Sequence, residues 1–297
     1  MTAHITKTDV LSTRQVAQLL GVGEATIKRW ADAGEIDCFR TPGGHRKFRL
    51  RDLTSFVQTR EYDAAGPLPT PLPAGADEAG DLAVDHFESA ALRGDTAALV
   101  AQLAAMCLRG YELAELFDDL VAPALRRFGD RWAGSKLSVA EEHVASQTVI
   151  DAIARAQPLA EPPGEPVRPD RGVAVVAAAA GEQHDIGARM AACLLRARGF
   201  EVLAPLAQTP ARDLAELLVR SRASLVVLCS TAPADLRAVE EQARVAVAAA
   251  RQTGARVIVG GPGMQRMALP PEARLLGSLR ELVVESEVAS HRRSRGQ

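Results

Sequence analysis

Two proline-rich segments divide this chain of 297 residues into three pieces. Residues 66–80 contain four prolines and residues 157–171 contain five, and such segments form extended, solvated connectors. The length alone, set against ~150 residues for an average domain, indicates about two domains. The predicted domains are residues 1–65, residues 81–157 and residues 170–292.

The composition excludes a disulfide-stapled miniprotein and a wholly disordered chain, because 47% hydrophobic residues can fill proper cores. The formal net charge is only -2, so any nucleic-acid-binding face must be local. Residues 1–60 carry ten Lys/Arg against six Asp/Glu, whereas residues 61–100 carry one Arg against eight Asp/Glu. The positive face is therefore expected on the first piece.

The cysteines and the N-terminus indicate a cytoplasmic protein. The four cysteines are at least 36 positions apart, so no pair has the close spacing of a zinc site and none suggests a secreted framework. Residues 1–9 lack the apolar stretch of an export signal. The longest apolar run, residues 173–180, is eight residues against the ~20 of a membrane helix, so no membrane association is expected.

The first piece predicts two short helices joined by a tight turn. One helix starts near Thr13, the turn falls at residues 21–23, and the second helix covers residues 24–33 with Ile27 and Trp30 facing inward. The outer face of a recognition helix keeps side chains for phosphates and base edges. On the second helix these outward positions are Thr26, Lys28 and Arg29.

Residues 39–49 predict a β-hairpin wing, because a Pro-Gly-Gly turn is flanked by apolar and basic side chains. Residues 51–60 predict a third helix that closes the small core. Basic side chains on a wing grip the sugar-phosphate backbone of DNA. The wing candidates are Arg40, His45, Arg46, Lys47 and Arg49.

A helical hairpin with a solvated charge run is the simpler alternative for this piece. However, residues 11–22 together with residues 41–48 closely resemble the winged helix-turn-helix of MerR-type regulators. Such proteins bind inverted repeats in DNA as dimers. The resemblance implies operator DNA as a partner, and leaves oligomerisation and signal detection to the rest of the chain.

The third piece predicts a doubly wound α/β sheet. Its small apolar run, residues 173–180, is typical of a strand buried on both faces of a parallel sheet. Helical patterns then alternate with short strands at residues 201–204, 225–229 and 256–259. Ligands of such flavodoxin-like sheets bind at the carboxyl ends of the strands.

Unusual residues follow three of these predicted strands. Residues 182–187 read Glu-Gln-His-Asp-Ile-Gly, Ser230 follows the third strand, and two glycines follow the fourth. Together they resemble the signature of cobalamin-binding domains that take the cofactor with its nucleotide base displaced from cobalt. The serine motif of that family usually ends in Leu, where this chain has Ala232. The alternative is a flavodoxin-like domain that binds nothing.

The resemblance implies a role for each of these residues. His184 becomes the lower axial ligand of cobalt, and Glu182 holds the other ring nitrogen and so fixes the tautomer and basicity of the imidazole. A Cβ atom would obstruct the close approach of the cofactor's nucleotide tail. The residues expected to leave the edge open are Gly187, Ser230, Gly260 and Gly261.

The middle piece predicts a four-helix bundle, because its helical periodicity stops near residues 94–96, 110 and 134–138. Trp132 is followed, after nine residues, by Glu142 and His143. This spacing resembles the helical cap of light-sensing, cobalamin-dependent repressors of the CarH type. In that family the tryptophan packs over the adenosyl group, and neighbouring residues shape the same pocket. By position these roles go to Trp132, Val139, Glu142 and His143.

The fold class is therefore multidomain, with an all-α winged helix-turn-helix, a four-helix bundle and a doubly wound α/β domain. The resemblance covers all three pieces in order. It implies a transcriptional repressor, and not an enzyme, with adenosylcobalamin, a cobalt corrinoid, as cofactor. In the dark a homotetramer would bind operator DNA, and light would break the cobalt–carbon bond and release the DNA.

One departure from that family is Ala133, where the best-known members have a histidine that captures cobalt after illumination. The upper ligand of the illuminated state stays open between water, another residue and release of the cofactor. Two other functions also stay open. One is a corrinoid carrier of methyl groups, which would not need a winged helix. The other is a regulator that senses cobalamin, haem or oxygen without light, or acts through a partner protein. No function is assigned to the acidic residues 61–95.

Overall fold

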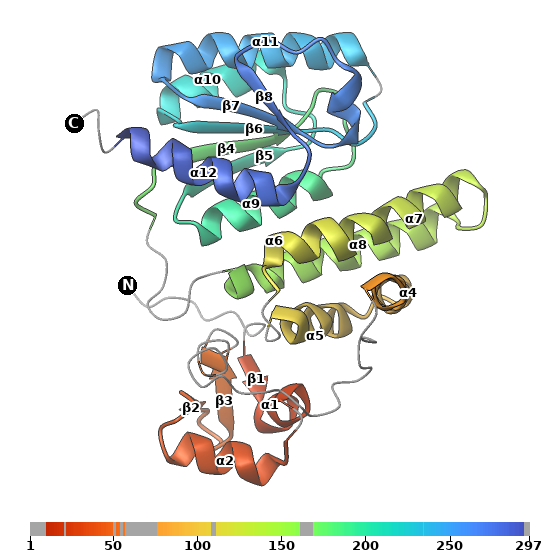
Figure 1. The fold of residues 1–297 in the computed structure, drawn as a ribbon, viewed down its shortest axis with the longest axis vertical. Helices are drawn as coiled ribbons and strands as arrows, with labels where there is room; N and C mark the ends of the chain where they lie inside the picture. Colours follow the sequence, from red (N-terminus) through yellow and green to blue (C-terminus); the bar gives the residue numbers. More distant parts are fainter. Residues whose placement is uncertain are drawn as a thin grey trace. The chain divides into compact units, whose positions relative to one another are not determined.

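The computed structural model describes residues 10–20, 22–49, 52–53, 56, 76–107, 111–160, 169–233 and 235–293. The chain separates into two compact units, Met1–Pro166 and Val167–Gln297 (Figure 1). This division falls inside the second proline-rich segment, while most of the first segment lies outside the described residues. The extents of the three predicted domains stay predictions. Within the described residues, no helix is both long and apolar enough to cross a membrane.

The N-terminal part of the first unit contains the two predicted helices and the predicted wing hairpin. A short strand before the first helix pairs with the second wing strand, so the winged domain also contains a three-stranded antiparallel sheet in the order β1-β3-β2. The sequence did not predict this added strand. The elements are β1 (Val10–Ser12), α1 (Thr13–Leu20), α2 (Glu24–Asp32), β2 (Phe39–Arg40) and β3 (Arg46–Arg49).

A small apolar core holds these elements together. Ile27 of α2 is fully buried, as predicted, and Phe48 of β3 is buried beside it in the same core. Trp30 is partly buried, and its ring centroid lies 5.2 Å from that of Phe56. Phe56 belongs to the predicted third helix over residues 51–60, of which only residues 52–53 and 56 are described.

The second part of the first unit is a helical bundle, and its described stops match the sequence pattern. Residue 110, a predicted stop, lies outside the described residues. The third helical segment differs from expectation because one π-helical turn interrupts it. The elements are α4 (Ala76–Leu92), α5 (Thr96–Cys107), α6 (Leu113–Leu116), η1 (Phe117–Val121), α7 (Ala122–Ala133), α8 (Val139–Ala156) and η2 (Gln157–Ala160).

Helix caps fix where the bundle helices start. The Asp95 carboxylate accepts a hydrogen bond from the backbone N–H of Ala98 at the start of α5. Before α8, the Ser138 hydroxyl accepts from the Glu141 N–H while the Glu141 carboxylate accepts from the Ser138 N–H, which is a capping box. The cap sets the first turn of α8, and this turn carries three of the predicted cofactor contacts.

The second unit is a five-stranded parallel sheet in the order β5-β4-β6-β7-β8. Four of its strands were predicted. The fifth, β8, was missed because its two central side chains are exposed, as on an edge strand. The strands are β4 (Val173–Ala178), β5 (Glu201–Leu206), β6 (Leu225–Cys229), β7 (Arg256–Gly260) and β8 (Ala273–Leu276). The helical elements are α9 (Ile186–Ala197), α10 (Ala211–Ser221), α11 (Leu236–Thr253), η3 (Pro262–Arg266) and α12 (Leu279–Arg293).

Helices cover both faces of this sheet, which gives the predicted doubly wound architecture (Figure 1). Successive strand residues point to opposite faces. Thus Val175 packs with α10 and α11 on one face, while Val176 packs with α9 and α12 on the other. Both residues are fully buried, which is why the strand is an unbroken apolar run.

Candidate cofactor and DNA sites

The predicted cofactor residues of the second unit lie at the topological switch point of the sheet. β4 has β5 on one side and β6 on the other, and the last residues of β4 and β6, Ala178 and Cys229, are paired. The loop with Glu182 and His184 leaves β4 at this point, and Ser230 follows β6 directly. Doubly wound sheets bind their ligands outside the carboxyl ends of the strands at such a point.

Glu182 is fully buried and connects the two loops. One of its carboxylate oxygens accepts hydrogen bonds from the Thr231 N–H at 2.7 Å, the Ala232 N–H at 2.9 Å and the Ser230 hydroxyl at 3.1 Å. The other oxygen lies 3.0 Å from the His184 backbone nitrogen and 2.9 Å from His184 Nδ1. Thr231 and Ala232 were not predicted, because their backbone donates and a sequence pattern does not show backbone contacts.

These donors keep the buried carboxylate ionised. Burial alone raises the pKa of Glu182, but the backbone hydrogen bonds from His184, Ala232 and Thr231 outweigh it, so that the pKa lies below its usual value. An ionised carboxylate only accepts hydrogen bonds. His184 Nδ1 is therefore the donor in this hydrogen bond, and in the neutral imidazole the lone pair lies on Nε2.

His184 fits the requirements of a ligand to a corrinoid cobalt. Its side chain is 62% exposed even though its Nδ1 atom is held by a fully buried partner. Among the described residues, no group of three or more His, Cys, Asp or Glu side chains can hold a metal ion. A single oriented imidazole suits a metal whose other positions are filled by a macrocycle, and neutral imidazole with a carboxylate behind it is a strong ligand.

Two neighbouring side chains do not compete for this role. Asp185 binds Arg189 through both carboxylate oxygens, at 2.8 Å and 2.7 Å, and thereby stays at the start of α9. Burial raises the pKa of the Cys229 thiol to about 12, so it is not a thiolate at neutral pH. His184 is the metal-ligand candidate that remains at this edge.

The glycines of the edge have different reasons for lacking a side chain. A Cβ atom on Gly187 would meet only Cys229, at 4.0 Å, and one on Gly260 would meet a backbone oxygen at 3.8 Å. By contrast, a Cβ atom on Gly261 would lie 2.2 Å from the backbone oxygen of Ser230, and one on Gly263 would lie 2.6 Å from Ser230 Oγ. Gly261 is thus required for packing of two loops, whereas a side chain at Gly187 would meet no atom closer than 4.0 Å.

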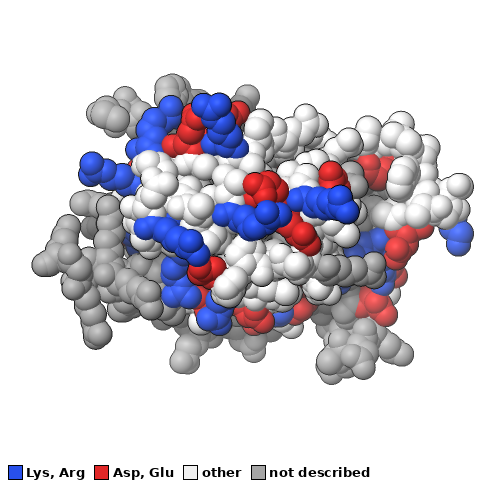
Figure 2. Space-filling model, turned by 90° about the horizontal axis from the view of Figure 1, so that it is seen from above, with Lys and Arg blue, Asp and Glu red and all other residues white. Residues whose placement is uncertain are grey.

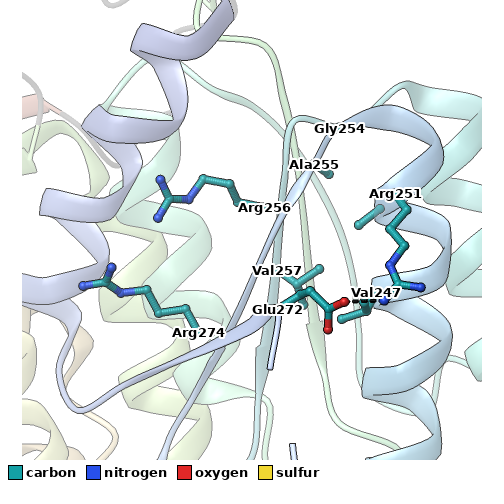
Figure 3. A pocket seen from close by; sticks show the side chains of 9 residues that line it. Val247, Arg251, Gly254, Ala255, Arg256, Val257, Glu272 and Arg274 are labelled. Atoms are coloured by element: carbon teal, nitrogen blue, oxygen red, sulfur yellow. Dashed lines mark hydrogen bonds and ion pairs between the residues drawn. The ribbon is translucent and has the colours of Figure 1, made fainter. Parts of the chain in front are cut away.

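A separate pocket of about 260 Å³ lies at the opposite, amino-terminal edge of this sheet (Figure 3). Its three arginines are already paired. Arg251 pairs with Glu272, while Arg256 and Arg274 both reach Glu285 of α12. The Glu285 side chain is only 7% exposed, so its two arginine pairs hold α12 against the sheet. The pocket plays no part in the predicted cofactor site.

In the bundle, the predicted cap residues flank the turn between α7 and α8. Trp132 is 52% exposed and Val139 is 54% exposed, unusual values for large apolar side chains. Val139, Glu142 and His143 share one face of α8 because they are three and four residues apart. The Glu142 carboxylate accepts from the Ser146 hydroxyl at 2.5 Å, while the His143 ring is 73% exposed. An exposed apolar patch with a few polar groups is typical of a binding surface.

Two of the three predicted DNA contacts on α2 are exposed. Figure 2, which views the molecule from above Figure 1, shows basic and acidic side chains interspersed on that side. On α2, by contrast, Lys28 and Arg29 are exposed and Thr26 is half-buried. They stay predicted DNA contacts, now placed on the outer face of the second helix of a helix-turn-helix.

The wing arginines are partly engaged within the domain. Arg46 forms an ion pair with Asp32 of α2, and Arg40 lies 3.9 Å from the same carboxylate. The Arg49 guanidinium lies 5.4 Å from the Phe39 ring centroid. Asp32 was not predicted to matter, because its partner is fourteen residues away, on the wing. His45 at the exposed wing tip and the half-buried Lys47 are the other two predicted wing contacts.

Replacing Lys47 with Ala is expected to lower DNA affinity several-fold on every sequence and to reduce the slope of log affinity against log salt by about 1, because one phosphate contact is lost. Fluorescence anisotropy titrations at several salt concentrations measure both quantities. Arg212→Ala is the matched control, since Arg212 is an exposed cation of the other unit. An unchanged salt slope for Lys47→Ala would move the backbone contact to another residue.

Comparison with known protein families gives three matches along the chain. Residues 10–61 match a helix-turn-helix domain. Residues 83–157 and residues 172–273 match two different B12 binding domain models. The matches place a DNA-binding motif before two cobalamin-binding domains, in the order that the sequence predicted.

Individual relatives cover different shares of the chain. The HTH-type transcriptional repressor CarH of Myxococcus xanthus is 29% identical over 240 residues, which are 73% of this chain and 77% of that protein. The transcriptional repressor DcmR of Methylorubrum extorquens is 38% identical over 58 residues, only 19% of this chain and 22% of the relative. The monomethylamine corrinoid protein of Methanosarcina barkeri has a similar fold, with a TM-score of 0.55 at 15% identity, over 70% of this chain and 99% of that one. The chain thus combines a helix-turn-helix domain with two B12 binding domains, and over 73% of its length it is similar to the transcriptional repressor CarH.

Proposed function

We propose that this protein is a light-responsive repressor that uses adenosylcobalamin as its signal-receiving cofactor. The observation that carries the proposal is the His184 imidazole, held through Nδ1 by the buried Glu182 carboxylate and exposed at the switch point of the sheet. When bound, the cofactor supplies a cobalt–carbon bond that visible light breaks. The residues of this chain would hold it, cover it and respond to its state.

Each predicted residue has a defined part in this proposal. His184 would bind cobalt, with Glu182 holding its Nδ1 atom and so orienting the imidazole. Trp132 would cover the adenosyl group, because its exposed ring offers the apolar surface that an adenine needs, and Glu142 and His143 would add polar contacts beside it. Gly187 would leave room for the nucleotide tail.

The response would reach DNA through assembly. In the dark, Trp132 is covered and the bundle packing favours a homotetramer that presents winged helices in pairs. Linked weak binders gain effective concentration only while they are joined, so the tetramer binds operator DNA tightly. In the light, Trp132 is uncovered, the bundle packs differently, and the DNA is released. The cofactor would thus regulate DNA binding because it has different affinities for the two assemblies. Genes for carotenoids and other photoprotective products are the targets that the family resemblance suggests.

The test is an absorption spectrum of the full chain mixed with adenosylcobalamin in the dark and gel-filtered to remove free cofactor. The spectrum, the elution volume and an operator gel shift are then repeated after green light. A retained corrinoid spectrum that changes with light, together with a later elution and loss of the gel shift, is the expected result. Retention with unchanged assembly and DNA binding would replace the proposal with a light-independent cobalamin sensor. Loss of all retention would reject His184 as the organising ligand.

A further inference from the structure

The acidic helix α4 carries a row of carboxylates that pair with α7. Asp81, Asp85 and Glu88 lie on one face of α4, since they are separated by four and three residues. Arg127 and Arg131, four residues apart on α7, face this row. The Arg127 guanidinium lies 2.7 Å from Asp81, 2.5 Å from Asp85 and 3.9 Å from Glu88. Three of the acidic residues before residue 95 thus have structural partners.

Glu88 differs from the other two carboxylates because it is buried. Its side chain is 10% exposed, against 77% for Asp81 and 60% for Asp85. Arg131 forms a direct ion pair with Glu88. A buried carboxylate that loses its cationic partner is strongly unfavourable, whereas an exposed pair contributes little. The Glu88–Arg131 pair is therefore the contact of this row that restricts where the end of α7 lies.

Arg131 also lies at the start of the turn that carries the predicted cap residues. Trp132 is the next residue, and α7 ends one residue later. The Arg131 carbonyl accepts from the Lys136 N–H at 2.7 Å, and the Trp132 carbonyl accepts from the Ser135 N–H at 2.9 Å. Arg131 further helps to lower the pKa of Glu141 in the first turn of α8, after the larger effect of the Ser138 hydrogen bonds. Arg131 is thus linked to α4 and to the start of α8 through its guanidinium, and to the turn through its backbone carbonyl.

We propose that Glu88 is a positioning residue of the cofactor cap: it holds Arg131, and through Arg131 it fixes the α7–α8 turn that presents Trp132. The inference concerns a contact inside the bundle, and its link to cobalamin rests on the proposed function. It also gives α4 a part in sensing, since a change at Trp132 would reach α4 through the Glu88–Arg131 pair.

The experiment uses the full chain with Trp30→Phe, which leaves Trp132 as the only tryptophan. Into this background are placed Glu88→Gln, the exchange Glu88→Arg with Arg131→Glu, and the control Asp81→Asn. The control removes one exposed negative charge from the same helix and the same row. Trp132 fluorescence anisotropy and acrylamide quenching are measured on cofactor-free protein well below its melting temperature. Adenosylcobalamin affinity is then measured in the dark by absorption titration.

With Glu88→Gln we expect lower Trp132 anisotropy, at least a twofold rise in the quenching constant, and about tenfold weaker adenosylcobalamin binding. Asp81→Asn should leave all three unchanged, and the charge exchange should restore most of the loss. If the Glu88–Arg131 pair only stabilised the bundle, Glu88→Gln would lower the melting temperature and leave the other three quantities unchanged. The proposal would be overturned if Glu88→Gln has the same Trp132 anisotropy and quenching constant as Asp81→Asn. It would also be overturned if Glu88→Gln changes both quantities but leaves adenosylcobalamin affinity unchanged. If the parent protein does not bind adenosylcobalamin at all, the proposed function fails, and the cofactor-free fluorescence still decides whether Glu88 positions Trp132.

Discussion

Replacing His184 with Ala is expected to weaken cobalamin binding by at least about 100-fold and to abolish the cofactor-dependent assembly with it. A residue that only orients a ligating histidine is worth about 10–100-fold in metal affinity, and removing the ligand itself should cost no less. The substitution removes a side chain that is 62% exposed, so the fold should remain intact. Absorption titration in the dark measures the affinity, and gel filtration of the same samples measures the assembly.

Two further variants make this result specific. His86→Ala removes another exposed imidazole, on α4 and outside the predicted sites, and should bind cobalamin normally. Glu182→Gln keeps the shape of the buried side chain but replaces one acceptor oxygen with a donor group, which faces N–H groups that need an acceptor. It should lose about 10–100-fold in affinity and also some stability. A tetramer that forms normally with cofactor in His184→Ala would show that another group binds the cobalt.

The elements that the sequence predicted are those whose cause is local. The strand at Val175 and Val176 is an apolar run because both faces of the sheet are covered, and the run itself predicts the strand. The hydrogen bond between Glu182 and His184 joins residues two apart in one loop, so spacing and chemistry suffice to expect it. The helical stop that the sequence predicted near residues 134–138 is likewise local, because Ser138 and Glu141 cap the start of α8 there.

The features that the sequence missed depend on contacts between distant segments. Glu182 receives hydrogen bonds from Thr231 and Ala232, which are 49 and 50 residues away and donate only backbone groups. The Glu88–Arg131 pair spans 43 residues, and its two helices are placed by packing of the whole bundle. Strand β8 has no apolar alternation, because it lies at the edge of the sheet. Its existence follows from pairing with β7, which only the assembled sheet reveals.

The reason for the glycines at the sheet edge was also only partly predictable. The sequence predicts the same role for Gly187 and Gly261, which is to leave room for the cofactor. The structure separates them, because Gly261 has φ +96 and ψ 159, in a region open essentially to glycine alone, and touches the Ser230 backbone. Gly187 lies in the first turn of α9, where a Cβ atom would meet only Cys229, at 4.0 Å. The two positions should therefore respond oppositely to the same added methyl group.

Replacing Gly261 with Ala should lower the free energy of unfolding of the C-terminal unit by about 3 kcal/mol or more. The strained backbone alone accounts for about 1–3 kcal/mol, and the Cβ atom adds a clash at 2.2 Å with a backbone oxygen that has no rotamer to change. Calorimetry measures the loss. Both tryptophans belong to the other unit, so a fluorescence melt should show its transition unchanged.

Gly187→Ala is the matched variant, and it separates stability from cofactor binding. Its new Cβ atom meets nothing closer than 4.0 Å, and alanine is a better helix former than glycine, so the unfolding free energy should stay the same or rise by up to about 1 kcal/mol. If the cofactor tail passes this edge, the same methyl group must nonetheless weaken cobalamin binding, because it occupies the space that the tail needs. Unchanged binding in a stable Gly187→Ala protein would place the tail elsewhere, while His184 could still be the ligand. Weaker binding without loss of stability would locate the tail at the carboxyl edge of β4 and β6.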